Sequence, residues 1–186
     1  MQTRRYWFLG LLLPGSFFIH QIMMAHLAPH AIDIEITPAI AATIISIIGF
    51  GSIIGRNLAG FVSDKIGARL YLSICLFIVT LALVLLLFTR DLWMFYLFAV
   101  MYGIAQGGIP ITQTMIIGDL FGLQYLGAIM ASTMVMGSIG GALGPPIAGG
   151  IFDANGSYHL AFIICLSLGT LAFILSLFLL RDTRDN

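Results

Sequence analysis

Hydrophobic residues form six long runs along the chain, separated by short polar connections. The runs lie at residues 6–27, 39–63, 70–88, 92–117, 127–152 and 159–180. About 20 helical residues are enough to cross a hydrocarbon core of about 30 Å, so each run is long enough to span a membrane. Because the connections are short, consecutive helices are expected to run antiparallel. The pattern predicts an all-α polytopic membrane protein with six transmembrane helices.

Polar side chains are distributed unevenly over the six runs. The runs at 70–88 and 159–180 carry no ionisable or amide side chain, which is typical of helices in contact with lipid at the periphery. The other four runs are expected to face a cavity or a partner. Their polar groups are His20, Gln21 and His26; Ser52 and Arg56; Tyr102, Gln106 and Gln113; Ser132 and Thr133.

A pattern of glycine and aspartate occurs twice in the chain. Its first copy is Gly51, Gly55, Gly60, Asp64 and Gly67. Its second copy, 89 residues later, is Gly140, Gly144, Gly149, Asp153 and Gly156. The recurrence predicts an internal duplication within a single domain, 1–186, with inverted three-helix repeats at about 6–88 and 92–180. Repeats of this kind occur in secondary transporters.

The glycines of both copies are expected to let helices pack closely, since small residues allow backbones to approach in membranes. In the second copy, Pro145 and Pro146 follow Gly144 and remove backbone donors, which bends a helix. Two interpretations of this segment stay open. It is either a static, kinked packing helix or a helix that moves against an opposing half. The predicted packing positions are Gly51, Gly55, Gly140, Gly144, Pro145 and Gly149.

Composition excludes several classes of protein. Hydrophobic residues make up 60% of the chain and charged residues 9%, whereas a soluble domain carries about 25% charged residues. The formal net charge is zero and the few basic residues are dispersed, so nucleic-acid binding is not expected. No enzyme motif is present, and neither Cys75 and Cys165 nor His20 and His26 have metal-ligand spacing. We therefore expect no catalytic residue, metal or cofactor.

Basic residues indicate how the chain lies in the membrane. In a six-span layout Lys65 and Arg69 share one side with both chain ends, which carry Arg4, Arg5, Arg181 and Arg184. Only Arg90 falls on the other side. By the positive-inside rule, both termini are predicted to be cytoplasmic and the loop at 28–38 external. The expected location is the plasma membrane, the inner membrane of a bacterium.

Arg56 is the strongest candidate for a binding residue. A charge at mid-membrane depth costs about 2.5 kcal/mol or more, so such a residue normally faces protein, water or a ligand. On a helix Gly49, Ser52, Arg56 and Ser63 lie within about 60° of one another. The alternative is that Arg56 extends to the interface or pairs with a backbone carbonyl.

A second polar stripe lies on the run at 92–117. Tyr102, Gln106 and Gln113 fall within about 40° on an ideal helix. Their amides and phenol suit hydrogen bonding to a carboxylate or hydroxyl, and Gln21 is added to the candidate substrate-binding set. Buried helix–helix hydrogen bonding is the equal alternative. His20 and His26 lie on different faces and are interpreted as packing or interfacial residues.

The segment from Gly60 to Arg69, GFVSDKIGAR, resembles the loop between the second and third helices of each half of major facilitator superfamily transporters. Ala68 stands where that loop commonly has a basic residue. The runs SIIGFGSIIGRNLAGFVSDKIG and GALGPPIAGGIFDANGSY are similar to the C-terminal half of monocarboxylate porters and oxalate/formate antiporters. The resemblance implies one six-helix half of a twelve-helix fold, working by alternating access.

The resemblance also implies roles for individual residues. Arg56 would serve the anionic substrate, while Ser52 stands where the monocarboxylate porters have an aspartate, which argues against proton coupling through an Asp–Arg pair. The glycine faces of the second and fifth helices would pack against the opposite half. A conformational latch would involve the loop residues and Asp119 on the same membrane side. The predicted gating set is Gly60, Asp64, Lys65, Gly67, Arg69 and Asp119.

Together these features predict secondary transport of a small organic anion, a monocarboxylate or dicarboxylate, by symport or antiport. The expected partners are lipid, the anion, and either an N-terminal six-helix half or a second copy of the chain. The alternative is a membrane interaction module, or a truncated transporter remnant, that does not transport.

Overall fold

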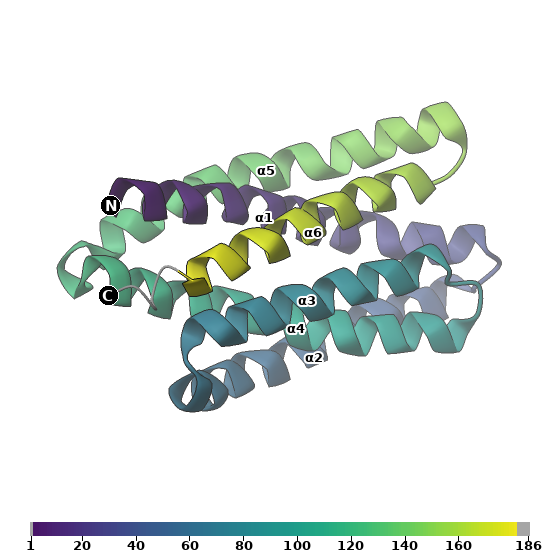
Figure 1. The fold of residues 1–186 in the computed structure, drawn as a ribbon. Helices are drawn as coiled ribbons and strands as arrows, with labels where there is room; N and C mark the ends of the chain where they lie inside the picture. Colours follow the sequence, from purple (N-terminus) through teal and green to yellow (C-terminus); the bar gives the residue numbers. More distant parts are fainter. Residues whose placement is uncertain (1, 182–186) are drawn as a thin grey trace.

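The structure is a computed structural model that describes the backbone of residues 2–181 and the side chains of residue 12 and residues 14–178. Within these limits the chain forms six α-helices and one short 3-10 helix, η1 (Leu123–Tyr125) (Figure 1). The α-helices are α1 (Gln2–Asp33), α2 (Pro38–Ile66), α3 (Ala68–Leu87), α4 (Leu92–Phe121), α5 (Leu126–Asn155) and α6 (His159–Arg181). The predicted all-α, six-helix fold is confirmed.

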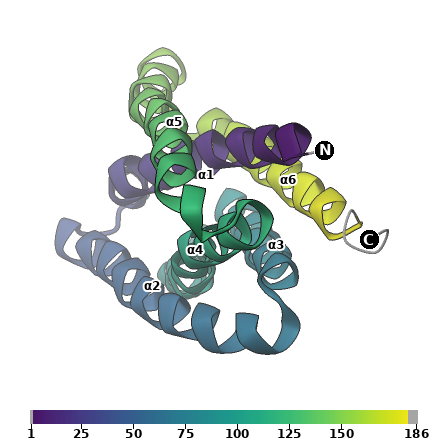
Figure 2. The same cartoon turned by 90° about the vertical axis from the view of Figure 1, so that its left-hand side faces the viewer.

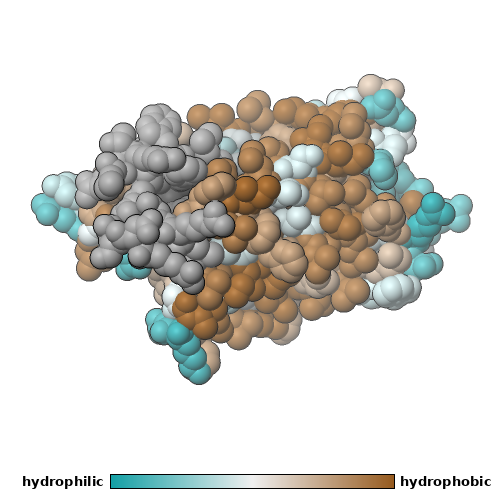
Figure 3. Space-filling view, in the orientation of Figure 1, coloured by the Kyte–Doolittle hydropathy of each residue, from teal (hydrophilic) through white to brown (hydrophobic). Residues whose placement is uncertain are grey.

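The helices form a bundle with an apolar belt between polar ends (Figure 3). Among the described residues, the five helical segments from α2 to α6 are long and apolar enough to cross a membrane. The predicted span at 6–27 lies within α1, and its first part falls outside the described side chains. The side chains of Arg4, Arg5, Arg181 and Arg184 also lie outside them. The start of α1 and the end of α6 share one end of the bundle, here named the terminus end (Figure 1).

The connection predicted at 28–38 is wrong in its length, because α1 continues through Pro29 to Asp33. Packing against other helices explains the extension. Ala31 is completely buried, and the His30 ring lies 4.9 Å from the Phe162 ring and 5.8 Å from the Phe95 ring, centroid to centroid. Proline inside a helix removes one helical N–H and costs about 3 kcal/mol, which the burial of the extra turns offsets.

Two closely packed helix pairs form the frame of the bundle. In the first, Gly51 and Gly55 of α2 lie directly against the backbone of Gly103 and Ile104 in α4. In the second, Gly140 of α5 lies against the backbone of Pro14 in α1. Figure 2 shows the two pairs end-on. The glycine faces were expected to pack against an opposite half. This is wrong for Gly51, Gly55, Gly140 and Gly144, which are buried inside the six-helix unit.

Helices α3 and α6 lie beside each other on one side of the bundle (Figure 2). Both helices expose large apolar side chains. Half of the most apolar stretch of α3 is buried, against 17% for that of α5. α3 therefore has lipid on one face only, since its other face packs on α4 and α6. The exposed stripe of α3 consists of Leu70, Ile74, Phe77, Leu81, Val84 and Phe88.

Gly67 and Gly156, equivalent positions in the predicted duplication, both end a helix. Gly67 has φ +87° and its N–H donates to the carbonyl of Ser63, ending α2. Gly156 has φ +67° and its N–H donates to the carbonyl of Phe152, ending α5. Positive φ is strained for residues with a Cβ, so glycine at both places ends the helix without that cost. These matched ends support the duplication, which stays a prediction.

We expect Gly55→Ala to destabilise the fold, because the added Cβ would overlap the carbonyl of Ile104 in α4. Overpacking of this kind costs about 1–3 kcal/mol. Gly60→Ala is the matched control, since a Cβ there meets nothing within 4 Å. The measurement is the temperature at which the detergent-solubilised protein loses its monodisperse chromatographic peak. Equal temperatures for the two variants would contradict the close α2–α4 contact.

Candidate functional site

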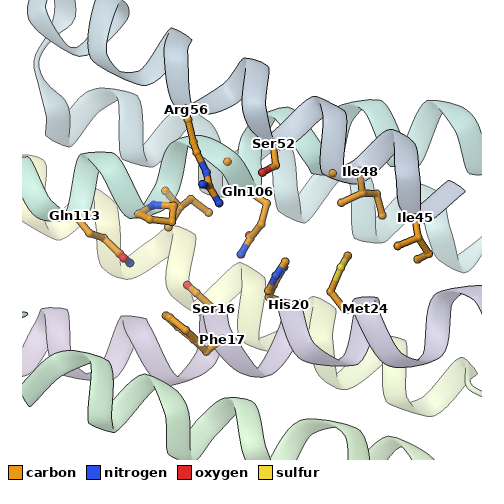
Figure 4. Close-up of a pocket in the computed structure, with 14 residues that line it drawn as sticks. Ser16, Phe17, His20, Met24, Ile45, Ile48, Ser52, Arg56, Gln106 and Gln113 are labelled. Atoms are coloured by element: carbon orange, nitrogen blue, oxygen red, sulfur yellow. The ribbon is translucent and has the colours of Figure 1, made fainter. Parts of the chain in front are cut away.

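A cavity of about 390 Å³ lies where α1, α2 and α4 meet, and it has both polar and apolar walls (Figure 4). It forms because the two glycine-packed pairs hold α1 and α2 on opposite sides of this space, with α4 behind them. Its lining residues are Ser16, Phe17, His20 and Met24 of α1; Ile45, Ile48, Gly49, Ser52 and Arg56 of α2; and Gln106, Gly107, Ile109, Pro110 and Gln113 of α4.

Arg56 extends from α2 into this space, with Ser52 one turn before it (Figure 4). In the described part of the chain, its guanidinium has neither an ion pair nor a hydrogen bond. The pairing with a backbone carbonyl that was considered as an alternative is therefore not made. Gly49 and Ser52 share the cavity wall with Arg56, as the helical spacing predicts, but Ser63 is buried elsewhere and does not line it.

The amides of Gln106 and Gln113 line the opposite wall and make no hydrogen bond among the described residues. Gln113 is only 6% exposed, and its Nε2 is buried without a partner. The helix–helix hydrogen bonds that a packing role would require are thus not formed. Pro110 has no backbone N–H, so the usual helical bond to the carbonyl of Gln106 is also missing. This wall carries polar groups available to a ligand.

His20 is a cavity residue that sequence reasoning treated as a packing or interfacial histidine. It lines the cavity from α1, its Nδ1 is buried without a hydrogen-bond partner, and the positive charge of Arg56 acts on it. An ionisable ring within an otherwise apolar helix was a sequence signal for such a role. The spacing of residues along one helix could not show that α1 lies close to α2.

Two predicted substrate-binding residues do not line the cavity. Tyr102 is completely buried and stacks on Phe98, with the ring centroids 5.2 Å apart. Gln21 is exposed and lies on the side of α1 that meets α5. A Cβ added to Gly141 of α5 would lie 3.1 Å from its Cγ. Tyr102 is thus held in the bundle core, and Gln21 lies at the α1–α5 contact.

His26 has a structural role that matches its interpretation as a packing residue. Its Nε2 lies 3.0 Å from the carbonyl of Pro145 in α5 and its Nδ1 3.3 Å from the hydroxyl of Tyr158. Because the carbonyl can only accept, Nε2 carries the proton. The pKa of the Tyr158 hydroxyl is raised, chiefly by burial, so it remains a donor. His26 thus joins α1, α5 and the α5–α6 connection.

The predicted gating residues lie at the terminus end, around the turns after α2 and α4. Asp64, Lys65 and Asp119 are exposed, and Lys65 Nζ lies 4.1 Å from the centroid of the Phe61 ring. Within the described residues, no ion pair joins Asp119 to Lys65 or Arg69. The latch remains a prediction about another conformation.

The cavity walls follow the same 89-residue offset as the glycine pattern. Phe17, His20 and Met24 of α1 correspond to Gln106, Ile109 and Gln113 of α4, and all six line the cavity. Corresponding positions therefore face the same space but differ in chemistry. α4 supplies two amides, whereas α1 supplies one ionisable ring.

Secondary transporters are built from bundles of this kind, with sites between membrane helices. The chain belongs to the Major Facilitator Superfamily, whose model matches residues 6–186. It is therefore related to transporters and not to enzymes. The family membership that the sequence motifs indicated is thus confirmed.

Curated relatives are monocarboxylate transporters. The chain is 29% identical to monocarboxylate transporter 12-B of Danio rerio over 83% of the chain and 34% of that protein. It is 28% identical to monocarboxylate transporter 11 of Mus musculus over 89% of the chain and 37% of that protein. It is 27% identical to monocarboxylate transporter 7 of Homo sapiens over 89% of the chain and 32% of that protein. The chain spans about a third of the length of these relatives.

We expect Gln113→Leu to leave thermal stability unchanged or raised, because the variant removes a buried amide that has no partner. His26→Leu is the contrasting variant. It leaves the carbonyl of Pro145 and the hydroxyl of Tyr158 without their partner, which costs about 1–3 kcal/mol. Thermal unfolding in detergent compares the two. If Gln113→Leu lowers the unfolding temperature as much as His26→Leu does, the Gln113 amide has a packing role after all.

Proposed function

We propose that the chain carries the anion-binding half of a secondary transporter for small monocarboxylates, working by alternating access. The observation that supports this most directly is Arg56, which enters the cavity without an ion pair among the described residues. An uncompensated cation at this depth is costly, and a bound carboxylate would offset that cost. The guanidinium fork matches the two oxygens of a carboxylate.

The remaining lining favours a small, partly apolar anion. Ser52, Gln106 and Gln113 offer neutral hydrogen-bonding groups, while Phe17, Ile48 and other apolar side chains cover the rest. Arg56 is the one fixed cation among the described lining residues. A single fixed charge is suited to a monocarboxylate more than to a dicarboxylate, whose second charge would lack compensation.

A second six-helix unit is proposed to close the cavity. Arg56 and Gly49 are exposed although they line it, and α2 and α5 have large exposed apolar faces. Either an N-terminal half or a second copy of the chain could cover these surfaces. We further propose that the terminus end is cytoplasmic in a plasma membrane, from the position of Lys65 and Arg69.

Arg56→Lys should lower carboxylate affinity by at least about tenfold, because lysine cannot form the bidentate pair and one such loss is worth about 1.4 kcal/mol. Arg90→Lys is the matched control, the same change at an exposed position outside the cavity. Binding of acetate, propionate, lactate, benzoate and succinate to the purified full chain is measured by calorimetry. Unchanged affinities in Arg56→Lys would overturn the proposed site.

The need for a second unit is tested with the same panel in proteoliposomes. Uptake by the chain alone should be absent unless the copies associate. Uptake from preparations shown to be monomeric by single-molecule photobleaching would contradict the need for a covering unit. Tighter binding of succinate than of the four monocarboxylates would contradict the monocarboxylate preference.

A further inference from the structure

We infer that His20 is the proton-binding residue of this cavity and that it couples proton binding to anion binding at Arg56. The inference rests on the proposed function, since it assumes that a carboxylate binds there. It concerns a different residue and a different event. A proton-binding residue of this cavity has to be a lining side chain that can gain and lose a proton.

Among the described lining residues, His20 is the one side chain that exchanges a proton near neutral pH. A guanidinium is not deprotonated in proteins, and the polar groups of α4 are uncharged amides. Ser52 occupies the position one turn before Arg56, where a carboxylate would otherwise compete for the proton. α2 contributes no other charged lining residue, and α5 and α6 contribute no described lining residue.

The surroundings of His20 suit a group that changes its protonation state during a cycle. Its Nδ1 is buried and has no hydrogen-bond partner, so no neighbouring group fixes the protonation of the ring. His26, six residues later in the same helix, shows the opposite case. Both of its ring nitrogens have hydrogen-bond partners, the hydroxyl of Tyr158 and the carbonyl of Pro145.

Electrostatics links the proton to the anion. Arg56 and His20 line the same cavity, so a second positive charge on the ring would be repelled by the guanidinium while the cavity is empty. A carboxylate beside Arg56 cancels much of that repulsion and adds an attraction of its own. Protonated His20 therefore becomes favourable when the anion is bound. By reciprocity, protonation of His20 strengthens anion binding by the same factor.

The charges balance over a complete cycle. In the empty cavity Arg56 carries one positive charge and His20 is neutral. In the loaded cavity the protonated ring adds one positive charge and the carboxylate one negative charge, so the net charge is unchanged. The proton comes from water on the entry side, binds a ring-nitrogen lone pair, and returns to water on the exit side. Both states can then change conformation with the same net charge in the membrane.

The test measures the affinity of the full-length wild-type chain for acetate, propionate, lactate and benzoate between pH 5.5 and 9, a range chosen around the ordinary histidine pKa of about 6.5. At pH values where His20 is neutral in the empty cavity, one proton binds with each anion. We therefore expect the Kd to rise about tenfold per pH unit there. A direct second measurement uses a pH-indicator dye in weakly buffered detergent. Anion addition should cause proton uptake by the wild-type protein.

His20→Gln should show a pH-independent Kd, equal to the weak high-pH limit of the wild type, and no proton uptake. His20→Asn replaces it if His20→Gln is not monodisperse. His159→Gln is the matched control, the same change at an exposed histidine outside the cavity, and should keep the wild-type pH profile. A merely structural His20 would change stability but would leave the slope of the profile intact.

The outcomes separate this inference from the proposed function. A pH-independent Kd in the wild type, or proton uptake that persists in the His20 variants, would overturn the role of His20 and leave the anion site standing. No binding of any of the four monocarboxylates at any pH would overturn the proposed function, and the role of His20 with it.

Discussion

Close backbone contact between helices is the constraint on which the rest of this structure depends. Apolar side chains gain little by leaving lipid for another helix, so association in a membrane relies on packing and polar contacts. Here Gly55 brings α2 against Ile104 of α4, and Gly140 brings α5 against Pro14 of α1. With these two pairs fixed, α3 and α6 fill one side, and a space remains where α1, α2 and α4 meet. The cavity is thus a consequence of where the small residues lie.

The two ends of the bundle are held in different ways. At the end opposite the termini, the rings of His30, Phe95 and Phe162 are in contact, and His26 hydrogen-bonds across to α5. At the terminus end, Asp64, Lys65 and Asp119 are exposed, and the described residues form no ion pair there. Side chains from several elements therefore meet at one end, whereas at the other end Gly67 and Gly122, both with positive φ, follow the ends of α2 and α4.

The cavity combines groups that keep their charge with a group that can change it. Arg56 supplies a permanent cation, and Gln106 and Gln113 supply polarity without charge. The proposed proton site, His20, lies on a different helix from the proposed anion site, so the coupling between them depends on the distance between α1 and α2. An electrostatic link of this kind needs no direct bond between the two residues. It also explains how coupling could persist where Ser52 provides no carboxylate.

The sequence alone determined that the chain is a six-helix membrane protein, because the length of an apolar run and the hydrocarbon thickness together decide whether a helix can span. It also identified Arg56, Ser52, Gln106 and Gln113 as candidate binding residues, since a polar group within such a run normally faces protein, water or a ligand. Only the tertiary structure decided that His20 joins this set and that Tyr102 and Gln21 do not. It also decided that the glycine faces are buried within the unit and that α1 extends to Asp33. Helical spacing gives the face on which a side chain lies, but which helix meets that face depends on packing between segments far apart in the sequence.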